Sequence, residues 1–176
     1  AINQANQMYQ KAKEMDYPLG TALALHAIGN TYLSSSTPQA AIESYREALE
    51  VIRKIPHASQ YVKTILPQLI LTKLKYHQMT DIEDNIRELE SVTDKGGNPQ
   101  DDFHLVYCQA FYRIQTHHLP EALNHIQQAK QISQQHLYPY FHLMIKYLYS
   151  CYYTESKEYI QALTTLDELL SHTRTT

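Results

Sequence analysis

The predicted architecture of the whole chain rests on residues 22–52, which read ALALHAIGNTYLSSSTPQAAIESYREALEVI. The apolar side chains before the serine run recur at helical spacing, as do those after it. Between them, Ser34-Ser35-Ser36-Thr37-Pro38 reads as a short turn, with Thr37 as a helix cap and Pro38 in the first turn. The stretch therefore predicts two helices folded back on each other.

Weaker copies of this hairpin run along the sequence. The marker of its second helix is Ala, an aromatic or aliphatic residue four positions on, and a small or apolar residue three further on. It occurs as Ala5/Tyr9/Ala12, Ala41/Tyr45/Ala48, Ala122/Ile126/Ala129 and Ala162/Leu166/Leu169, with Asn85/Leu89/Val92 as a degenerate copy. A period of about 40 residues is typical of a helical solenoid, in which small residues let neighbouring helices approach closely.

The period divides the chain into one orphan helix and four repeats. The orphan second helix spans residues 1–15, and the repeats span 18–55, 58–94, 98–134 and 137–173. The turn from Asp94 to Pro99 is interpreted as a long connection between repeats, with Asn98 as a cap. Pro67 either kinks a helix or begins one. Thr80 with Glu83 predicts a capping box, and Ser156 predicts another cap. Because the chain starts with Ala1 and in mid-repeat, we expect it to be a segment of a longer protein.

The residues at the signature positions resemble the tetratricopeptide repeat (TPR) family. The match is carried by Ile28-Gly29, Tyr32, Ala41, Tyr45 and Ala48, whereas Leu25 replaces the family's tryptophan and Ser36 its turn glycine. The other repeats match loosely, at Tyr76 and Leu89, at Ala110, and at Ser150 and Tyr153. The positions assigned to holding the fold are Ile28, Gly29, Tyr32, Ala41, Tyr45, Ala48, Ala122, Ile126, Ala129, Ala162 and Leu166. The resemblance implies an all-α fold, a right-handed superhelix of antiparallel helix hairpins with about nine helices.

In TPR proteins the first helix of each repeat lines a concave binding face. The resemblance places there Leu23, His26, Asn30, Ile70, Leu74, His104, Tyr107, Phe111, Tyr147 and Cys151. Asn30 matches an asparagine that chaperone-binding members use to hold a peptide carboxylate. The companion basic positions hold His26, Pro67 and Cys108, so the resemblance does not extend to a receptor for chaperone tails. An apolar and aromatic face favours a peptide or protein segment with apolar anchors.

Tyrosine is abundant around one helix. Four tyrosines lie within seven residues, after two more: Tyr138, Tyr140, Tyr147, Tyr149, Tyr152 and Tyr153. A single helical stripe cannot hold all of them, since each residue turns the side chain by about 100° around the axis. Some of them therefore face the groove, a partner or solvent, and a rigid ring with a polar tip suits recognition. The alternative is that they pack against a neighbouring repeat or against a downstream part of the protein. Both interpretations remain open at this point.

Composition and charge exclude several function classes. The net charge of −3 gives no basic footprint for nucleic acid, and no apolar run reaches the roughly 18 residues of a membrane helix. Cys108 and Cys151 read as reduced, buried thiols. The cluster of His117, His118, Glu121 and His125 gives only a partial face for a metal and reads as a solvated turn. We therefore expect no enzyme activity, no cofactor and no metal site.

The sequence thus predicts a non-catalytic protein- or peptide-binding module. The style of its repeats resembles TPR arrays in bacterial signalling proteins, where they precede a histidine-kinase-like or DNA-binding output module. That resemblance implies a sensory or regulatory role, with another domain of the parent protein as a further partner. A stand-alone assembly scaffold or an adaptor of co-chaperone type is the alternative, and homo-oligomers are compatible with both. The compartment, cytoplasmic or periplasmic, is left open by the sequence.

Overall fold

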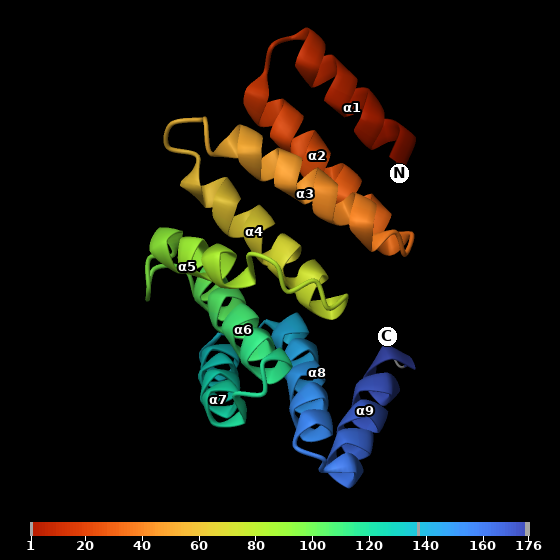
Figure 1. Cartoon of the computed structure of the whole chain (residues 1–176), viewed down its shortest axis with the longest axis vertical. Helices are drawn as coiled ribbons and strands as arrows, with labels where there is room; N and C mark the ends of the chain where they lie inside the picture. Colours follow the sequence, from red (N-terminus) through yellow and green to blue (C-terminus); the bar gives the residue numbers. More distant parts are fainter. Residues whose placement is uncertain (1, 137, 175–176) are drawn as a thin grey trace. The chain divides into compact units, whose positions relative to one another are not determined.

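The computed structural model describes residues 2–136 and 138–174. In this part of the chain all regular structure is helical, with nine α-helices and no strand, which confirms the all-α prediction. The helices are α1 (Ile2–Glu14), α2 (Pro18–Ser34), α3 (Pro38–Ile52), α4 (Ser59–Lys75), α5 (Ile82–Val92), α6 (Pro99–Gln115), α7 (Leu119–Gln135), α8 (Pro139–Glu155) and α9 (Tyr159–Arg174). Figure 1 shows them with these labels.

The chain divides into two compact units, Ala1–Thr93 and Asp94–Thr176. The division falls directly before the turn that carries Gly96 and Gly97. Unit 1 contains α1 to α5 and unit 2 contains α6 to α9. The sequence interpretation, in which the repeats run on as one superhelix, stays a prediction.

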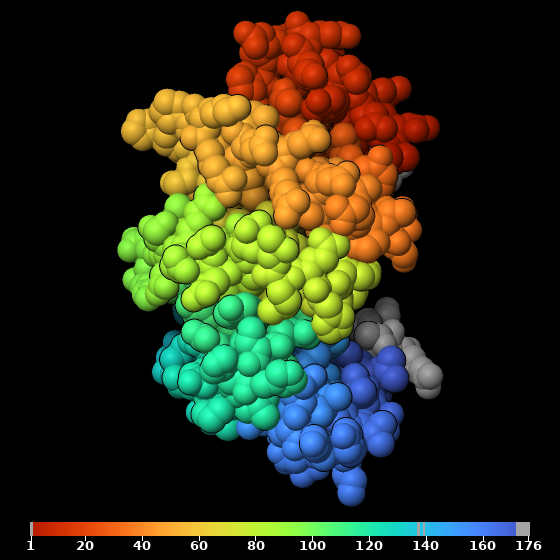
Figure 2. All heavy atoms as spheres, in the orientation of Figure 1, coloured from red at the N-terminus to blue at the C-terminus, as the bar shows by residue number. Residues whose placement is uncertain are grey.

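Within each unit, helices that follow one another along the chain pack as antiparallel neighbours (Figure 1). In unit 1, α2 lies between α1 and α3, and α4 lies between α3 and α5. In unit 2, α6 packs against α7 and α8, and α8 also packs against α7 and α9. The space-filling view shows side chains closing the spaces between the ribbons of unit 1 (Figure 2).

The helix starts explain the 40-residue period. The helices α4, α6 and α8 begin at residues 59, 99 and 139, and α2 begins at residue 18. Each of these four helices has 17 residues. Proline opens α2, α3, α6 and α8, where its fixed φ fits the first turn and its missing N–H has no helical partner to lose.

The tight turns share one backbone conformation. A residue other than glycine has a positive φ, between 47° and 65°, in five of them: Asp16, Ser36, His77, His117 and Lys157. At Ser36 the turn is closed by Thr37 N–H donating to the carbonyl of Tyr32 (3.0 Å) and by Ser36 N–H donating to that of Leu33 (3.2 Å). This pair of hydrogen bonds is the Schellman motif, for which a left-handed residue is required and glycine is preferred. Ser36 thus occupies the position at which the resemblance expects glycine.

The predicted caps were right in position at two sites and wrong at two. Asn98 caps α6, where its side chain accepts from Gln100 N–H at 3.0 Å. Thr37 is the residue before α3, but its hydroxyl donates to the carbonyl of Tyr32 instead of accepting from the helix. Thr80 does not cap α5, because that helix begins at Ile82 and the cap position is held by Asp81 with φ 58°. Ser156 ends α8 and does not begin α9.

Pro67 lies inside α4, which runs through it from Ser59 to Lys75. The possibility that a helix begins at this proline is therefore excluded. The helices of unit 1 enclose a core around Tyr45, whose side chain is fully buried. Gly29 of α2 lies so close to the Tyr45 ring that a Cβ atom there would be 2.5 Å from Cε1. The glycine allows α2 and α3 to close on the ring, as the repeat pattern predicts.

Most of the residues assigned to holding the fold are buried. These are Ile28, Gly29, Ala41, Tyr45, Ala48, Ala122, Ile126, Ala129 and Ala162, while Tyr32 and Leu166 are half-buried. In each unit, the second helix of a repeat carries a small residue that has no exposed surface: Ala41 in unit 1 and Ala122 in unit 2. Close helix packing therefore depends on them, since a larger side chain has no room.

Candidate functional site

The residues predicted to line a binding face on α2 lie at the surface. Leu23 and Asn30 are exposed and His26 is half-buried, so the three form one stripe along the helix. Burial lowers the pKa of His26, because the charged imidazolium loses solvation. The stripe is an open, mixed surface with one apolar side chain.

Asn30 is already engaged within its own hairpin. Its Oδ1 accepts a 2.7 Å hydrogen bond from the hydroxyl of Tyr45, and its Nδ2 lies 3.4 Å from Nε2 of His26. The ring of His26 also lies against Tyr45, with centroids 5.8 Å apart. The amide oxygen therefore anchors the hydroxyl of the buried tyrosine, which occupies one of its two acceptor positions.

On α4 the structure corrects the predicted face. Ile70 and Leu74 are fully buried and belong to the core. The exposed positions of this helix are instead Ser59, Gln60, Thr64 and Lys75, next to the half-buried Lys63, Gln68 and Leu71. Since α4 begins 41 residues after α2, Leu23 and Asn30 correspond to Thr64 and Leu71. Ile70 corresponds to Gly29, which is also buried, so the two helices turn the same face toward the core.

In unit 2 the predicted residues of α6 turn toward α8. Tyr107 and Phe111 are buried, and His104 is half-buried. Phe111 meets Tyr147 edge to face, with ring centroids 5.9 Å apart and an interplanar angle of 86°. His104 lies against Phe141, and Phe103 stacks on the same Phe141 ring at 3.7 Å. This part of the predicted face is thus an aromatic seam between two helices.

Two predicted residues, Tyr147 and Cys151, line a hollow of about 260 Å³ in unit 2. The hollow lies among α6, α8 and α9, and its other lining residues are Ile114, Gln115, Ser150, Thr154, Glu155 and Leu166. Both predicted side chains are half-buried. The hollow has an apolar part from Ile114 and Leu166 and a polar rim from Gln115, Thr154 and Glu155.

Burial governs the ionisation of the groups in this hollow. It raises the pKa of Tyr147 to about 12, with the neighbouring Cys151 adding to the shift. It also raises the pKa of Cys151, although hydrogen bonds from Tyr147 and Ser150 work in the opposite direction. At neutral pH both groups are therefore protonated and uncharged. Glu155 brings its carboxyl group to the rim, where its Oε2 lies 3.1 Å from Nδ1 of His117.

In the tyrosine-rich helix α8 the rings pack on one another, and a ligand-facing role for any of them stays a prediction. Four of its tyrosines are half-buried, so that each has one part against the protein and another part exposed to solvent: Tyr147, Tyr149, Tyr152 and Tyr153. Tyr149 stacks on Tyr153 with centroids 5.8 Å apart. Before the helix and in its first turn, Tyr138 and Tyr140 are exposed by 40% and 68%. The rings therefore pack on each other while keeping part of their surface open.

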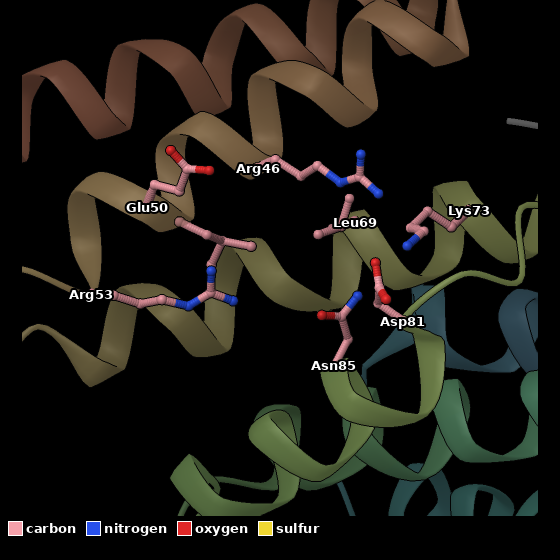
Figure 3. A pocket seen from close by; sticks show the side chains of 8 residues that line it. Arg46, Glu50, Arg53, Leu69, Lys73, Asp81 and Asn85 are labelled. Carbon is pink, nitrogen blue, oxygen red and sulfur yellow. The ribbon is translucent and has the colours of Figure 1, made fainter.

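A second hollow, of about 210 Å³, lies in unit 1 and was missed by the sequence analysis. It is lined by Arg46, Leu49, Glu50, Arg53, Leu69, Lys73, Asp81 and Asn85 (Figure 3). These residues come from α3, α4 and α5, with Arg53 directly after α3 and Asp81 directly before α5. The available signal was Lys73, a charged residue inside an otherwise apolar helical stretch.

Around His117 the structure shows local contacts. His117 pairs with Glu155, and Nδ1 of His118 lies 3.1 Å from the hydroxyl of Thr116. Across the described residues, no group of three or more His, Cys, Asp or Glu side chains is placed to hold a metal ion. Cys108 is fully buried, and burial raises the pKa of its thiol. Among the described helices none is long and apolar enough to cross a membrane.

Comparison with models of protein families, with curated proteins and with solved structures found no match.

Proposed function

We propose that this chain is a non-catalytic protein- or peptide-binding domain of TPR type. The observation that carries the proposal is the hollow among α6, α8 and α9, which contains Tyr147 and Cys151. It offers a half-buried ring, aliphatic walls and a polar rim, which is the composition of a pocket for one apolar anchor of a peptide. The helix starts at intervals of 40 and 41 residues also support a repeat domain.

The chemistry of the hollow favours binding over catalysis. Its thiol and its phenol both have raised pKa values, so neither supplies a nucleophile or a base at neutral pH. The ring of Tyr147 is held by Phe111 and so loses little side-chain freedom when a ligand contacts it. Glu155 and Gln115 on the rim are suited to the backbone N–H groups of an extended segment.

A hollow-filling variant tests this proposal. Phage carrying a random library of twelve-residue peptides are selected on the wild-type chain and then tested on Thr154→Trp. Thr154 is exposed on α8 and lines the hollow, so the indole fills the hollow without disturbing the core. The control is His142→Trp, an exposed position on the same helix that does not line the hollow. We expect selected peptides to lose at least tenfold in affinity for Thr154→Trp only. Equal binding to both variants, or no selected peptide, contradicts the proposal.

A second function, self-association as an assembly scaffold, is favoured by the outer face of α9. Ile160 and Leu163 are exposed by 80% and 63%, with Tyr159 exposed beside them. Contiguous apolar side chains at this exposure are typical of interaction surfaces. Sedimentation velocity across a concentration series tests it, with the double variant Ile160→Lys/Leu163→Lys against the control Gln161→Lys/Thr164→Lys. Association that persists in the first variant, or a wild type that stays monomeric, argues against this function.

The context in a bacterial sensory or regulatory protein is proposed from the resemblance of the repeats alone. The partner in that case is another domain of the same protein. The reading frame downstream of residue 176 tests it directly: a transmembrane, kinase or helix-turn-helix segment is the expected result. A frame that ends without any such segment removes the proposal and favours an adaptor.

A further inference from the structure

The polar hollow in unit 1 differs in character from the one in unit 2. Its lining holds three cationic side chains, Arg46, Arg53 and Lys73, against two carboxylates, Glu50 and Asp81. Two leucines, Leu49 and Leu69, supply the apolar wall. Arg46 and Arg53 are exposed residues of α3 and of the position directly after it, whereas Lys73 is buried on α4, so the fold brings cations from two packed helices to one hollow.

Lys73 is the unusual member of this set. The residue is only 1% exposed, and its ammonium donates to the carbonyl of Thr80, which leaves further N–H donors. Burial lowers its pKa, the nearby Arg46 lowers it further, and Asp81 acts in the opposite direction. A buried ammonium facing a guanidinium is costly to keep charged, and an anion placed between them removes that cost.

The guanidinium groups of Arg46 and Arg53 differ in their hydrogen-bond partners. Arg53 donates two hydrogen bonds to the carboxylate of Glu88, at 2.9 and 2.6 Å, and Glu50 adds a further attraction. The exposed side chain of Arg46 has no hydrogen bond or ion pair with any other residue that the structure describes. The side-chain amide of Asn85 likewise has no partner among those residues. The donors of the hollow that have no protein partner among the described residues are therefore those of the exposed Arg46 and the half-buried Asn85.

The arrangement in Figure 3 separates the hollow into two ends. The polar ends of Arg46, Lys73, Asp81 and Asn85 gather at one end, and Glu50 lies at the other beside Arg53. The guanidinium of Arg46 points away from Glu50. The first end carries two cations and one carboxylate. At the second end Arg53 is matched by two carboxylates, Glu50 and Glu88. A single positive charge is thus left over near Arg46.

We propose that this hollow binds a small monocarboxylate, with the carboxylate group held between the guanidinium of Arg46 and the ammonium of Lys73 and by the amide of Asn85. A carboxylate is planar and accepts two parallel hydrogen bonds from a guanidinium. Its single charge matches the one excess positive charge at this end. Asp81 and Glu50 disfavour phosphate, which carries a larger negative charge close to them. The leucine wall takes the short aliphatic part of the ligand.

Titration followed by nuclear magnetic resonance tests the proposal at the two groups that it names. Sodium acetate is added to the isotope-labelled chain while the Nε–H signal of Arg46 and the side-chain amide signal of Asn85 are recorded. Sodium chloride and sodium phosphate at matched ionic strength are the comparison arms. We expect both signals to shift and saturate with acetate, and neither to saturate with chloride or phosphate.

Two matched variants complete the experiment. Arg46→Gln removes the proposed contact, and we expect at least tenfold weaker acetate binding at the Asn85 signal. Arg87→Gln makes the same charge change on α5, outside the hollow and at a side chain that is 66% exposed, and acetate binding persists there. The proposal is overturned if acetate gives no saturable shift in the wild type, if phosphate saturates while acetate does not, or if Arg46→Gln binds acetate like Arg87→Gln.

Discussion

The hydroxyl of Tyr45 donates a 2.7 Å hydrogen bond to Oδ1 of Asn30, which joins α3 to α2 in the first repeat. The ring below that hydroxyl is fully buried against Gly29. One side chain thus combines the close helix contact that shapes the hairpin with a polar anchor at its surface. Burial raises the pKa of Tyr45 to about 12, so the group remains a donor at physiological pH.

Removing only this hydroxyl tests the anchor. Tyr45→Phe keeps the ring and loses one hydrogen bond, so we expect the free energy of unfolding to fall by about 1 kcal/mol. Urea denaturation of unit 1 signals measures it. Tyr32→Phe on the same hairpin is the control, since the Tyr32 hydroxyl has no hydrogen bond to another described residue. An equal loss in both variants contradicts the anchoring role.

Removing the whole ring is expected to be far more costly. Tyr45→Ala leaves a cavity in a fully buried site, and the free energy of unfolding falls by about 3–5 kcal/mol, by analogy with other large aromatic truncations. The midpoint of thermal unfolding reports this loss. If the midpoint barely moves, the ring does not hold α2 and α3 together, and the assignment of the repeat signature is overturned.

A methyl group at Gly29 is expected to be damaging. The added Cβ would lie 2.5 Å from the Tyr45 ring, which has no room to move, so Gly29→Ala should lower the free energy of unfolding by about 1–3 kcal/mol. Gly20→Ala is the matched control: its Cβ would lie 2.4 Å from Tyr17, an exposed ring that can turn away. There the higher helix propensity of alanine leads us to expect no loss. Equal costs would mean that burial is not the deciding factor.

The left-handed turn residues predict a stabilising substitution. Ser36 has φ 58°, a conformation that costs a residue with a Cβ atom about 1–2 kcal/mol. Ser36→Gly removes that cost but adds freedom to the unfolded chain, so we expect a net gain of about 0.5–1 kcal/mol. Ser35→Gly, at φ −91°, has no strain to relieve and should be destabilising. Differential scanning calorimetry distinguishes the two; a lower melting temperature for Ser36→Gly would refute the strain argument.

Acid is expected to destabilise both units through two histidines. Burial lowers the pKa values of His26 and His104 in the folded chain below the usual 6.5, with Asp101 partly offsetting the shift at His104. The unfolded chain therefore binds protons first as the pH falls, and the stability present above pH 6.5 is lost progressively below it. Urea unfolding at pH 7 and pH 5 measures the loss. His104→Gln should reduce this dependence in unit 2; an unchanged pH profile would exclude His104 as its source.

The two thiols are expected to react in a fixed order. Burial raises the pKa of both, but Cys108 is fully buried whereas Cys151 is half-buried at the hollow of unit 2. Because the thiolate is the reactive form, iodoacetamide should modify Cys151 slowly at pH 8 and Cys108 only after unfolding. Peptide mass spectrometry over a time course gives the order. Modification of Cys108 ahead of Cys151 in the folded chain would contradict this difference in burial.

Local chemistry made most helices and several turns predictable. Proline with a preceding polar residue located the starts of α3 and α6, and the spacing of small and aromatic residues located Ala41, Tyr45 and Ala48 in the core. The failures were also local, as at Asp81. That residue takes a left-handed conformation which displaces the predicted capping box, and no sequence pattern marks it.

The candidate sites were harder to predict because exposure depends on neighbours. Tyr147 and Cys151 were placed on a binding face by the resemblance to TPR proteins, and they do line a hollow. Ile70 and Leu74 were nominated by the same reasoning and are buried, since the exposed stripe of α4 is set by how α3 and α5 cover it. The pocket around Arg46 and Lys73 was not foreseen, as its residues come from three separate helices.

The amino-acid sequence by itself therefore determined the helical class, the 40-residue period and the small residues that allow close packing. These features depend on intrinsic propensity and on spacing along one chain. Only the tertiary structure decided which helix faces stay open, that Asn30 is engaged by Tyr45, and that Arg46 faces a buried Lys73. The physical reason is that burial, pairing and pKa are set by atoms distant in sequence, which meet only when the helices have packed.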